Sequence, residues 1–411
     1  MRKYDIFTLS NGIRVAHNQI TTTKIVHCGI MLDIGSRDES RDNQGIAHFW
    51  EHMAFKGTRK RKAFHILNRL EALGGELNAF TDKEKILFYA SLRDEYVERA
   101  VELLTDITFD SIFPKNQIEK ERNVILEEMS MYSDDPDDSL QDEFDNVIFG
   151  GHALGMNILG TEKTVKSFRR KDFRDFINSN LDTSRIVFSC VGNVTKEKAI
   201  ELAQKYMGSI PTIKAKQSRK KFVGYKAKEV TLTRPVKQAR VAIGRTAYNL
   251  SDERRSSFYM LTNILGGPGM NSRLNMALRE KHGFVYSVGA QFVPFTDTGL
   301  FVVSFGTEPS QMERSIELVK NEMKKLRKER LGVKQLAAAK EQIMGQIAIA
   351  EESNINFMIM MARQLLDLDR VVPNEEMFKR IKNTSPSKLL ELANEMFQER
   401  QMSYLYMKPV E

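Results

Sequence analysis

A chain of 411 residues is too long for one ordinary hydrophobic core and suits two domains of about 200 residues each. Its 41% hydrophobic and 28% charged residues exclude a disordered chain and are typical of a soluble globular protein. The basic residues behind the net charge of +8 are spread along the sequence, without an aromatic platform or a known nucleic-acid motif, so we expect no nucleic-acid partner.

The first residues predict no secretory signal, because Met1–Phe7 contain no apolar stretch before strand-like sequence begins. No segment approaches the roughly 18 consecutive apolar residues of a membrane-spanning helix. The two cysteines, Cys28 and Cys190, lie in apolar strand-like runs and are expected to be buried free thiols. We therefore expect a cytoplasmic protein of a prokaryote.

A helix is predicted around His48-Phe49-Trp50-Glu51-His52, and it carries the first candidate metal ligands. Positions i and i+4 of a helix lie about 40° apart, so His48 and His52 face the same side. Two neutral imidazoles on one face are a standard zinc pair, and Glu51 on the same flank can take a proton from the attacking water. His-x-x-Glu-His is a recognised zinc-peptidase motif. The alternative, two unrelated histidines on one helix face, is disfavoured in a chain with only seven histidines.

A second predicted helix, around Gln117–Met131, is the best source of the third ligand that a catalytic zinc needs. Its core-facing stripe is defined by helical spacing and consists of Ile118, Arg122, Ile125 and Met129. Glu121 and Glu128 each follow a stripe residue by three positions, so they flank the core on the same side. One is expected to bind the metal and the other to support it, whereas Glu119 and Glu127 should face solvent.

An acidic run follows this helix, from Asp134-Asp135-Pro136-Asp137-Asp138 through Asp145. A solvated loop and helix face is the simpler interpretation of such a run. A negative patch that favours basic peptide substrates is the alternative, and both interpretations stay open.

The second half of the sequence repeats features of the first. Phe80-Thr81-Asp82 recurs 215 residues later as Phe295-Thr296-Asp297, and a strand-like run follows each copy, at Ile86–Leu92 and Gly299–Phe305. We predict two homologous domains, at 1–211 and 229–411, joined by a basic linker at 212–228. Strands alternate with helices in each half, which predicts an α+β fold with helices packed on one face of each sheet.

The second half also serves as an internal control for the metal site. Offsets of 210 and 218 residues align the candidate residues His48, Glu51, His52, Glu121 and Glu128 with Phe258, Leu261, Thr262, Ala339 and Gln346. Every candidate residue is therefore absent from the second copy, although the apolar framework persists. Residues that served only packing would have been retained in part, so the pattern favours a metal function confined to the first domain.

Two segments of the first half resemble the pitrilysin and mitochondrial-processing-peptidase family of zinc peptidases, the inverzincins. Gly45–Thr58, with the sequence Gly-Ile-Ala-His-Phe-Trp-Glu-His-Met-Ala-Phe-Lys-Gly-Thr, looks like the family's active-site helix, and Glu121–Glu128 looks like its second metal helix. The resemblance runs along nearly the whole chain and implies one Zn²⁺ per chain. It assigns roles to five residues: His48, His52 and Glu128 as ligands, Glu51 as catalytic base, and Glu121 as a supporting carboxylate.

Gly74–Thr81 resembles the family segment that leads into an edge strand, which pairs with the substrate backbone. The resemblance implies that the Asn78 side chain and the Ala79 carbonyl contact the substrate. The alternative is a turn near Gly74-Gly75 in which Asn78 is only a turn residue. The family often has further Ser or Thr residues after this segment. This chain has Asp82-Lys83-Glu84-Lys85 there, a departure that bears on subsite preference.

Gly266–Leu274 and Leu278–Ser287 resemble the family's C-terminal signature, in which an arginine and a tyrosine seven residues apart reach the substrate. These residues are Arg279 and Tyr286 here, and a guanidinium and a phenol are suitable donors to an oxyanion. Without the resemblance, Arg279 would be a solvated helix charge and Tyr286 a strand core residue. His282 occupies a position where arginine is common in the family.

The resemblance also implies the fold, the reaction and the assembly. The fold would be the metallohydrolase fold of the processing peptidases, with mainly antiparallel sheets. The protein would be a zinc metalloendopeptidase that cleaves unfolded peptides or extended termini, as a homodimer or as a heterodimer with an inactive relative. The alternative is a non-catalytic structural subunit of the same family. Such subunits typically lack metal ligands, and this sequence retains all of them.

Overall fold

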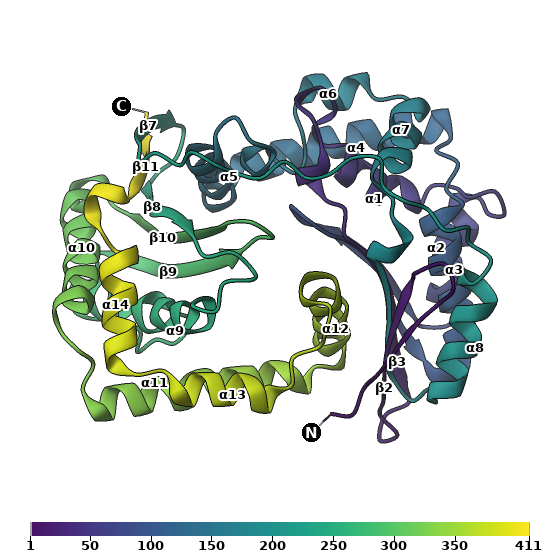
Figure 1. Cartoon of the computed structure of the whole chain (residues 1–411). Helices are drawn as coiled ribbons and strands as arrows, with labels where there is room; N and C mark the ends of the chain where they lie inside the picture. The colour runs from purple at the N-terminus through teal and green to yellow at the C-terminus, as the bar shows by residue number, and fades with distance from the viewer. Residues whose placement is uncertain (1, 411) are drawn as a thin grey trace. The chain divides into compact units, whose positions relative to one another are not determined.

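The computed structural model describes residues 2–410, which divide into two compact units, each built around one β-sheet (Figure 1). Unit 1 comprises Met1–Ser130, Met156–Lys220 and Ile349–Val371, and unit 2 comprises Met131–Gly155, Lys221–Ala348 and Val372–Glu411. Each unit therefore includes a segment from the opposite half of the sequence.

The sheet of unit 1 has the strand order β1-β2-β6-β3-β5-β4. In this order its strands are Asp5–Thr8, Arg14–Gln19, Ile186–Gly192, Ile25–Leu32, Ile86–Arg93 and Glu76–Thr81. β2 and β6 are parallel, and the other neighbouring strands are antiparallel. β6 is buried along its whole length, which suits its apolar sequence and a position inside a sheet that is covered on both faces.

The sheet of unit 2 repeats this topology, with the strand order β7-β11-β8-β10-β9. In this order its strands are Glu229–Arg234, Ser403–Pro409, Ala239–Ala247, Gly299–Thr307 and Val285–Pro294. The order corresponds to β2-β6-β3-β5-β4 of unit 1, and β7 and β11 are the parallel pair. The predicted fold class, two homologous α+β domains with mainly antiparallel sheets, is therefore confirmed.

The main core of unit 1 lies between one face of its sheet and a layer of helices. These helices are α1 (Ile46–Ala54), α2 (Ala63–Glu71), α3 (Val97–Phe109), α4 (Lys115–Asp134), α6 (Glu162–Ser167), α7 (Arg170–Asn180) and α8 (Lys196–Met207). A second apolar cluster lies on the opposite face of the sheet, where α12 (Asn354–Leu368) packs with Met358 and Met361 against Met31 and Leu87. Both faces of this sheet are thus covered.

Unit 2 is built in the same way. Its main core is formed by one sheet face with helices α9 (Arg255–Gly266), α10 (Met312–Lys328), α11 (Val333–Glu352), α13 (Asn374–Asn383) and α14 (Pro386–Met396), and with a helical turn at Asn275–Glu280. The opposite face is covered by α5 (Pro136–Phe149), whose Phe144 and Phe149 join an apolar cluster with Val302 and Leu405.

One helix from the other half of the sequence therefore covers the second face of each sheet. The sequence pattern predicted helices on one face of each sheet. The structure adds a helix on the second face, α12 in unit 1 and α5 in unit 2. The reason is the composition of the strands: residues such as Leu87 and Val302 point to the second face and would leave an apolar patch without a cover.

Cys28 of β3 and Cys190 of β6 are buried free thiols in the main core of unit 1. The antiparallel register of the two strands places these residues directly opposite each other. Burial raises the pKa of both thiols, that of Cys190 to about 12. Both groups are therefore protonated and shielded at neutral pH.

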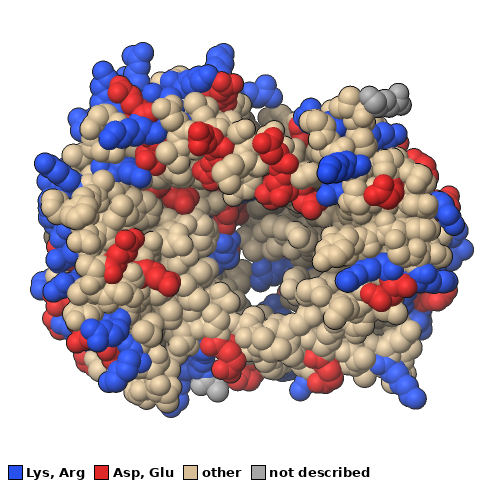
Figure 2. All heavy atoms as spheres, turned by 180° about the vertical axis from the view of Figure 1, so that it is seen from behind, with Lys and Arg blue, Asp and Glu red and all other residues tan. Residues whose placement is uncertain are grey.

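The surface carries charges of both signs. On the face that Figure 2 shows, Lys and Arg side chains are interspersed with Asp and Glu side chains in small groups. Along residues 2–410, no helix combines the length and the apolar character that crossing a membrane requires.

A cluster of buried ion pairs lies in unit 1, where β3 ends and β5 begins. The Lys85 side chain, which is 1% exposed, lies 2.8 Å from Asp33 and 2.8 Å from Asp367 of α12. Arg219, from the predicted linker, lies 2.8 Å from Asp33 and also donates to its carbonyl oxygen. Burial alone would raise the pKa of Asp33. The charges of Arg219, Lys85 and Arg185 outweigh burial and hold this pKa well below its ordinary value.

Removal of one buried charge from this cluster should destabilise unit 1. Arg219→Ala is expected to lower the free energy of unfolding by about 3–5 kcal/mol, because buried carboxylates lose their partner. Urea denaturation followed by the fluorescence of Trp50, the single and fully buried tryptophan, measures this change. Lys216→Ala, at an exposed position in the same linker, is the matched control and should change stability by less than about 0.5 kcal/mol. Equal stability of the Arg219 variant and the parent protein would contradict the prediction.

The destabilisation should also depend on pH. The folded-state pKa of Asp33 is lowered, so the stability that its charge contributes is present above the unfolded-state pKa and lost as pH falls through the folded-state value. The difference between parent and Arg219→Ala should therefore be constant near neutral pH. It should shrink only below about pH 3.9, the ordinary pKa of Asp. If the difference already shrinks between about pH 8 and pH 6, a group other than Asp33 causes the pH dependence.

Candidate metal centre

Helix α1 begins at a glycine and is capped by a buried carboxylate. Gly45 has φ +92°, and a Cβ there would lie 2.5 Å from the carbonyl oxygen of Leu159, so only glycine fits. The backbone N–H groups of Gly45 and Ala47 donate to the two carboxylate oxygens of Glu39, each at 2.8 Å. Helix starts leave N–H groups without partners, and the Glu39 side chain satisfies two of them. Burial raises the pKa of Glu39 to about 8, and the bonds from Ala47 and Gly45 oppose this shift.

One side of α1 packs against the core of unit 1. Phe49, Trp50 and Met53 are fully buried in that core. His48, Glu51 and His52 lie on the remaining side, where they contact α4 and β4 through the bonds described below. The predicted helical spacing therefore places the motif with both imidazoles on one side.

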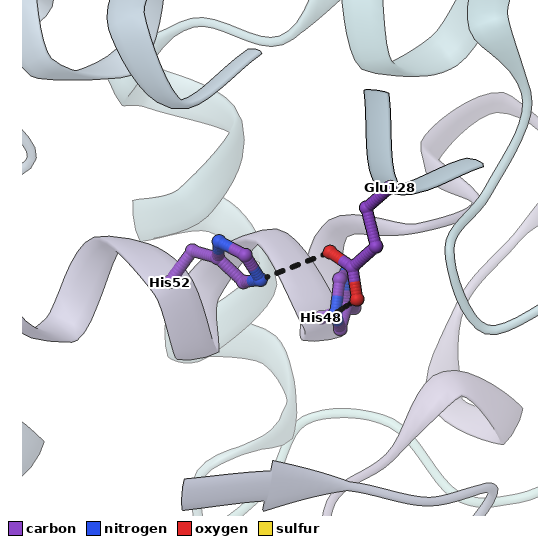
Figure 3. A group of neighbouring side chains, drawn as sticks. All are labelled: His48, His52 and Glu128. Carbon is purple, nitrogen blue, oxygen red and sulfur yellow. Dashed lines mark ion pairs between the residues drawn. The ribbon is translucent and has the colours of Figure 1, made fainter. Parts of the chain in front are cut away.

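His48 and His52 of α1 and Glu128 of α4 come together as a three-residue group (Figure 3). Glu128 Oε1 lies 3.7 Å from His48 Nε2, and Glu128 Oε2 lies 3.4 Å from His52 Nε2. One ligand atom from each residue lies within 4.8 Å of the other two. Tetrahedral zinc with bonds of about 2.0–2.1 Å needs ligand atoms about 3.4 Å apart, so this donor set fits a zinc ion with small side-chain rotations.

Glu121 supports this group from one side. Its buried carboxylate lies 3.3 Å from His52 Nδ1 through Oε2 and 2.8 Å from Lys56 Nζ through Oε1. Burial would raise the pKa of Glu121, but the hydrogen bonds from His52 and Lys56 outweigh burial and lower it. A bond from Nδ1 to Glu121 leaves Nε2 of His52 as the atom that can bind a metal.

The two histidines differ in their electrostatics. Burial, together with the neighbouring His52, lowers the pKa of His48 to about 4, so this imidazole is neutral. Burial also lowers the pKa of His52, but hydrogen bonds with Glu121 and Glu128 outweigh it and raise the pKa to about 9. The pKa of Glu128 is lowered, first by its hydrogen bond with His52. A metal ion would therefore replace one proton held between His52 and the carboxylates.

Glu51 stands beside the three-residue group but is not part of it. The hydroxyl of Thr81, on β4, donates to Glu51 Oε2 at 2.6 Å. Burial raises the pKa of Glu51, and the bond from Thr81 opposes this shift. A half-buried carboxylate with a raised pKa next to a metal site is suited to accept and return a proton.

Asn78 and Ala79, the predicted substrate-contacting residues, lie on β4 at the edge of the unit 1 sheet. Asn78 is exposed, and its Oδ1 accepts the N–H of Ala79 at 2.8 Å. β4 pairs with β5 along one side, from Glu76 to Thr81. An edge strand of this kind offers main-chain groups to an added strand.

Arg279 and Tyr286 belong to unit 2. Arg279 lies in the helical turn at Asn275–Glu280, and Tyr286 lies on β9 with 86% of its surface exposed. The Arg279 guanidinium lies 5.6 Å from the centroid of the Tyr286 ring. Tyr286 is therefore not the strand core residue that periodicity without the family resemblance would indicate.

Lys56, Thr81 and Glu39 contact the motif or cap its helix, and sequence reasoning did not select them. Lys56 and Thr81 lie within the two segments that resemble the peptidase family, at 45–58 and 74–81, but no spacing rule marks either residue. Glu39 precedes α1 by several residues in an irregular segment, so no helical periodicity connects it to the helix that it caps.

Comparison with known proteins gives a consistent set of relatives. Residues 14–162 match a family model described as insulinase, peptidase family M16, and residues 167–343 match one described as the inactive domain of peptidase M16. An uncharacterized zinc protease of Bacillus subtilis is 32% identical over 393 residues, which cover 96% of this chain and 95% of the relative. An uncharacterized zinc protease of Streptomyces coelicolor is 31% identical over 400 residues, with 96% and 87% covered.

Two solved structures share the fold over the full chain. A protease from Helicobacter pylori has a TM-score of 0.91 at 21% identity, with 100% of both chains covered. A peptidase M16 inactive domain from Pseudomonas fluorescens has a TM-score of 0.92 at 18% identity, with 100% of this chain and 99% of the other covered. At these identities the likeness shows the fold.

Glu121 should tune metal affinity without binding the metal. Glu121→Gln is expected to weaken zinc binding about 10- to 100-fold. The neutral amide orients His52 less firmly and no longer offsets positive charge at the metal centre. Competition with a chromophoric chelator measures the dissociation constant. Glu119→Gln, an exposed position on the same helix, is the matched control and should bind zinc as the parent does. An unchanged affinity in Glu121→Gln would remove Glu121 from the metal centre.

Proposed function

Because the chain belongs to the insulinase family of peptidases, family M16, we propose that it is a zinc metalloendopeptidase that cleaves unfolded peptides or extended termini. The observation that carries this proposal is the convergence of His48, His52 and Glu128, with Glu51 beside them on α1. The names of the relatives support zinc as the metal. One zinc ion per chain is part of the proposal.

The proposed reaction divides the work among these side chains. Bound by His48, His52 and Glu128, zinc would supply a Lewis acid that polarises the scissile carbonyl and acidifies water. Glu51 takes a proton from the attacking water and later passes it to the leaving amine. Burial keeps the pKa of Glu51 above its ordinary value, which favours its role as a proton carrier.

Substrate contacts are proposed on both units. The exposed Asn78 side chain and the Ala79 carbonyl of β4 would bind the peptide main chain, which explains acceptance of many sequences. Arg279 and Tyr286 would donate to the oxyanion of the tetrahedral intermediate, and both carry exposed polar ends. Glu121 completes the set as the carboxylate that orients His52.

A second candidate function is a non-catalytic structural subunit, because residues 167–343 match a domain described as inactive. The candidate ligands and Glu51 lie outside that segment, in the part matched by the peptidase model. The intact three-residue group therefore favours the catalytic proposal.

Replacement of the base tests the proposed reaction. The zinc-loaded chain should cleave a basic, unfolded, internally quenched peptide, and Glu51→Gln should lower the rate about 10²- to 10⁴-fold, the usual contribution of general acid–base catalysis. Rates are compared by fluorescence at equal protein and equal zinc content. Glu127→Gln, exposed on α4, is a matched control that should keep the parent rate. A zinc-loaded parent that cleaves no peptide, or a Glu51→Gln variant as fast as the parent, would count against the proposal.

We further propose that the chain works in the cytoplasm as a homodimer or as a heterodimer with an inactive relative. Sedimentation equilibrium of the purified chain tests the first form, for which a mass of twice 47.2 kDa is expected. A monomer that gains activity only with a second, ligand-free chain would support the heterodimer. A fully active monomer would contradict both forms.

A further inference from the structure

Thr81 connects the edge strand of unit 1 to the proposed base. Its hydroxyl donates to Glu51 Oε2 at 2.6 Å. A hydrogen bond of this length to a carboxylate is a strong one. The same strand, β4, carries Asn78 and Ala79, so one element touches both the proposed substrate site and Glu51.

The alternation of β4 explains why Thr81 faces Glu51. Leu77 and Ala79 pack against the helix-covered core of unit 1, whereas Phe80 packs on the opposite face, against the α12 cluster. Side chains at every second strand position share a face, so Thr81 continues the series of Leu77 and Ala79. Its hydroxyl therefore points toward α1.

The turn after Thr81 fixes its backbone. Thr81 pairs with Ile86 in the β4–β5 ladder. In the next residue, Asp82, Oδ1 accepts the backbone N–H groups of Glu84 at 2.8 Å and Lys85 at 2.6 Å, and Oδ2 lies 2.7 Å from the guanidinium of Arg363. Lys85 is in turn held by the buried ion pairs at the end of this sheet. The position of the Thr81 hydroxyl is therefore set by rigid elements.

We infer that Thr81 is a positioning residue for the proposed reaction: its hydroxyl holds Oε2 of Glu51 and leaves Oε1 to accept the proton of the attacking water. This rests on the proposed function, in which Glu51 is the base. A glutamate side chain has several rotatable bonds, and a fixed donor on one oxygen restricts them. Reaction rates are sensitive to displacements of about 1 Å in such groups.

Removal of the hydroxyl should lower the rate and leave substrate binding intact. Thr81→Val keeps the β-branched shape of a strand residue and removes the donor. Its kcat should fall about 10- to 100-fold, with KM within about twofold of the parent, because the interaction serves the chemical step. Thr81→Ser should restore kcat to within about threefold of the parent. Thr108→Val removes a buried hydroxyl that bonds Leu104 inside α3 and should keep parent kinetics.

A second measurement tests the contact without catalysis. Urea unfolding of the zinc-free protein, followed by Trp50 fluorescence, is compared for parent, Thr81→Val, Glu51→Ala and the double variant. If the two side chains interact, the shift in the unfolding midpoint of the double variant should be smaller than the sum of the single shifts. Additive shifts would overturn the inference whatever the activity of the enzyme.

The outcomes separate this inference from the proposed function. If the zinc-loaded parent cleaves peptide and Thr81→Val keeps the parent kcat, the positioning role is overturned and the peptidase proposal stands. If Thr81→Val loses zinc affinity in proportion to its loss of kcat, Thr81 acts on the metal site as a whole and the positioning role is overturned. If the parent with stoichiometric zinc cleaves nothing, the proposed function fails and the positioning role fails with it.

Discussion

The buried side chain of Glu39 accepts hydrogen bonds from the N–H groups at the start of α1, and the rest of the candidate metal centre depends on that contact. It fixes where the helix starts, at Ile46, one residue after the left-handed conformation of Gly45. Phe49, Trp50 and Met53 then fix the rotation of the helix against the sheet. Once start and rotation are set, the spacing of the motif decides which atoms face α4 and β4. The geometry of the candidate metal centre thus depends on a helix cap and three apolar side chains as well as on the ligands.

Much of the fold and part of the site follow from the sequence, because they depend on local periodicity. Helical spacing placed His48 and His52 on one side and separated Glu121, which is buried, from Glu119 and Glu127, which are exposed. The repeated segments indicated two related domains, and the strand orders of the two sheets agree. The choice between Glu121 and Glu128 as ligand was open from spacing alone, since both lie on the same side of α4.

The remainder depends on contacts between distant segments, which periodicity does not report. The apolar faces of α5 and α12 are visible in the sequence, but nothing local says that each covers the sheet of the opposite half. Arg219 stands in a basic, linker-like stretch, and its burial follows only from carboxylates that the fold brings around it. Thr81 has the composition of an ordinary strand residue. Its contact with Glu51 requires knowing that β4 passes beside α1.

The facing pair of Cys28 and Cys190 has a practical consequence for studying the dynamics of this protein. Both thiols lie in unit 1, and the sequence holds no others, so a thiol-specific reagent reacts with unit 1 alone. Burial keeps them protonated in the folded unit, and labelling must wait until the core around them opens. The labelling rate therefore reports how often the core of unit 1 opens, under native conditions and without denaturant. Unit 2 contains no cysteine and gives no signal in the same experiment. A cysteine pair introduced at the equivalent strands β8 and β11 would allow the opening of the two repeats to be compared.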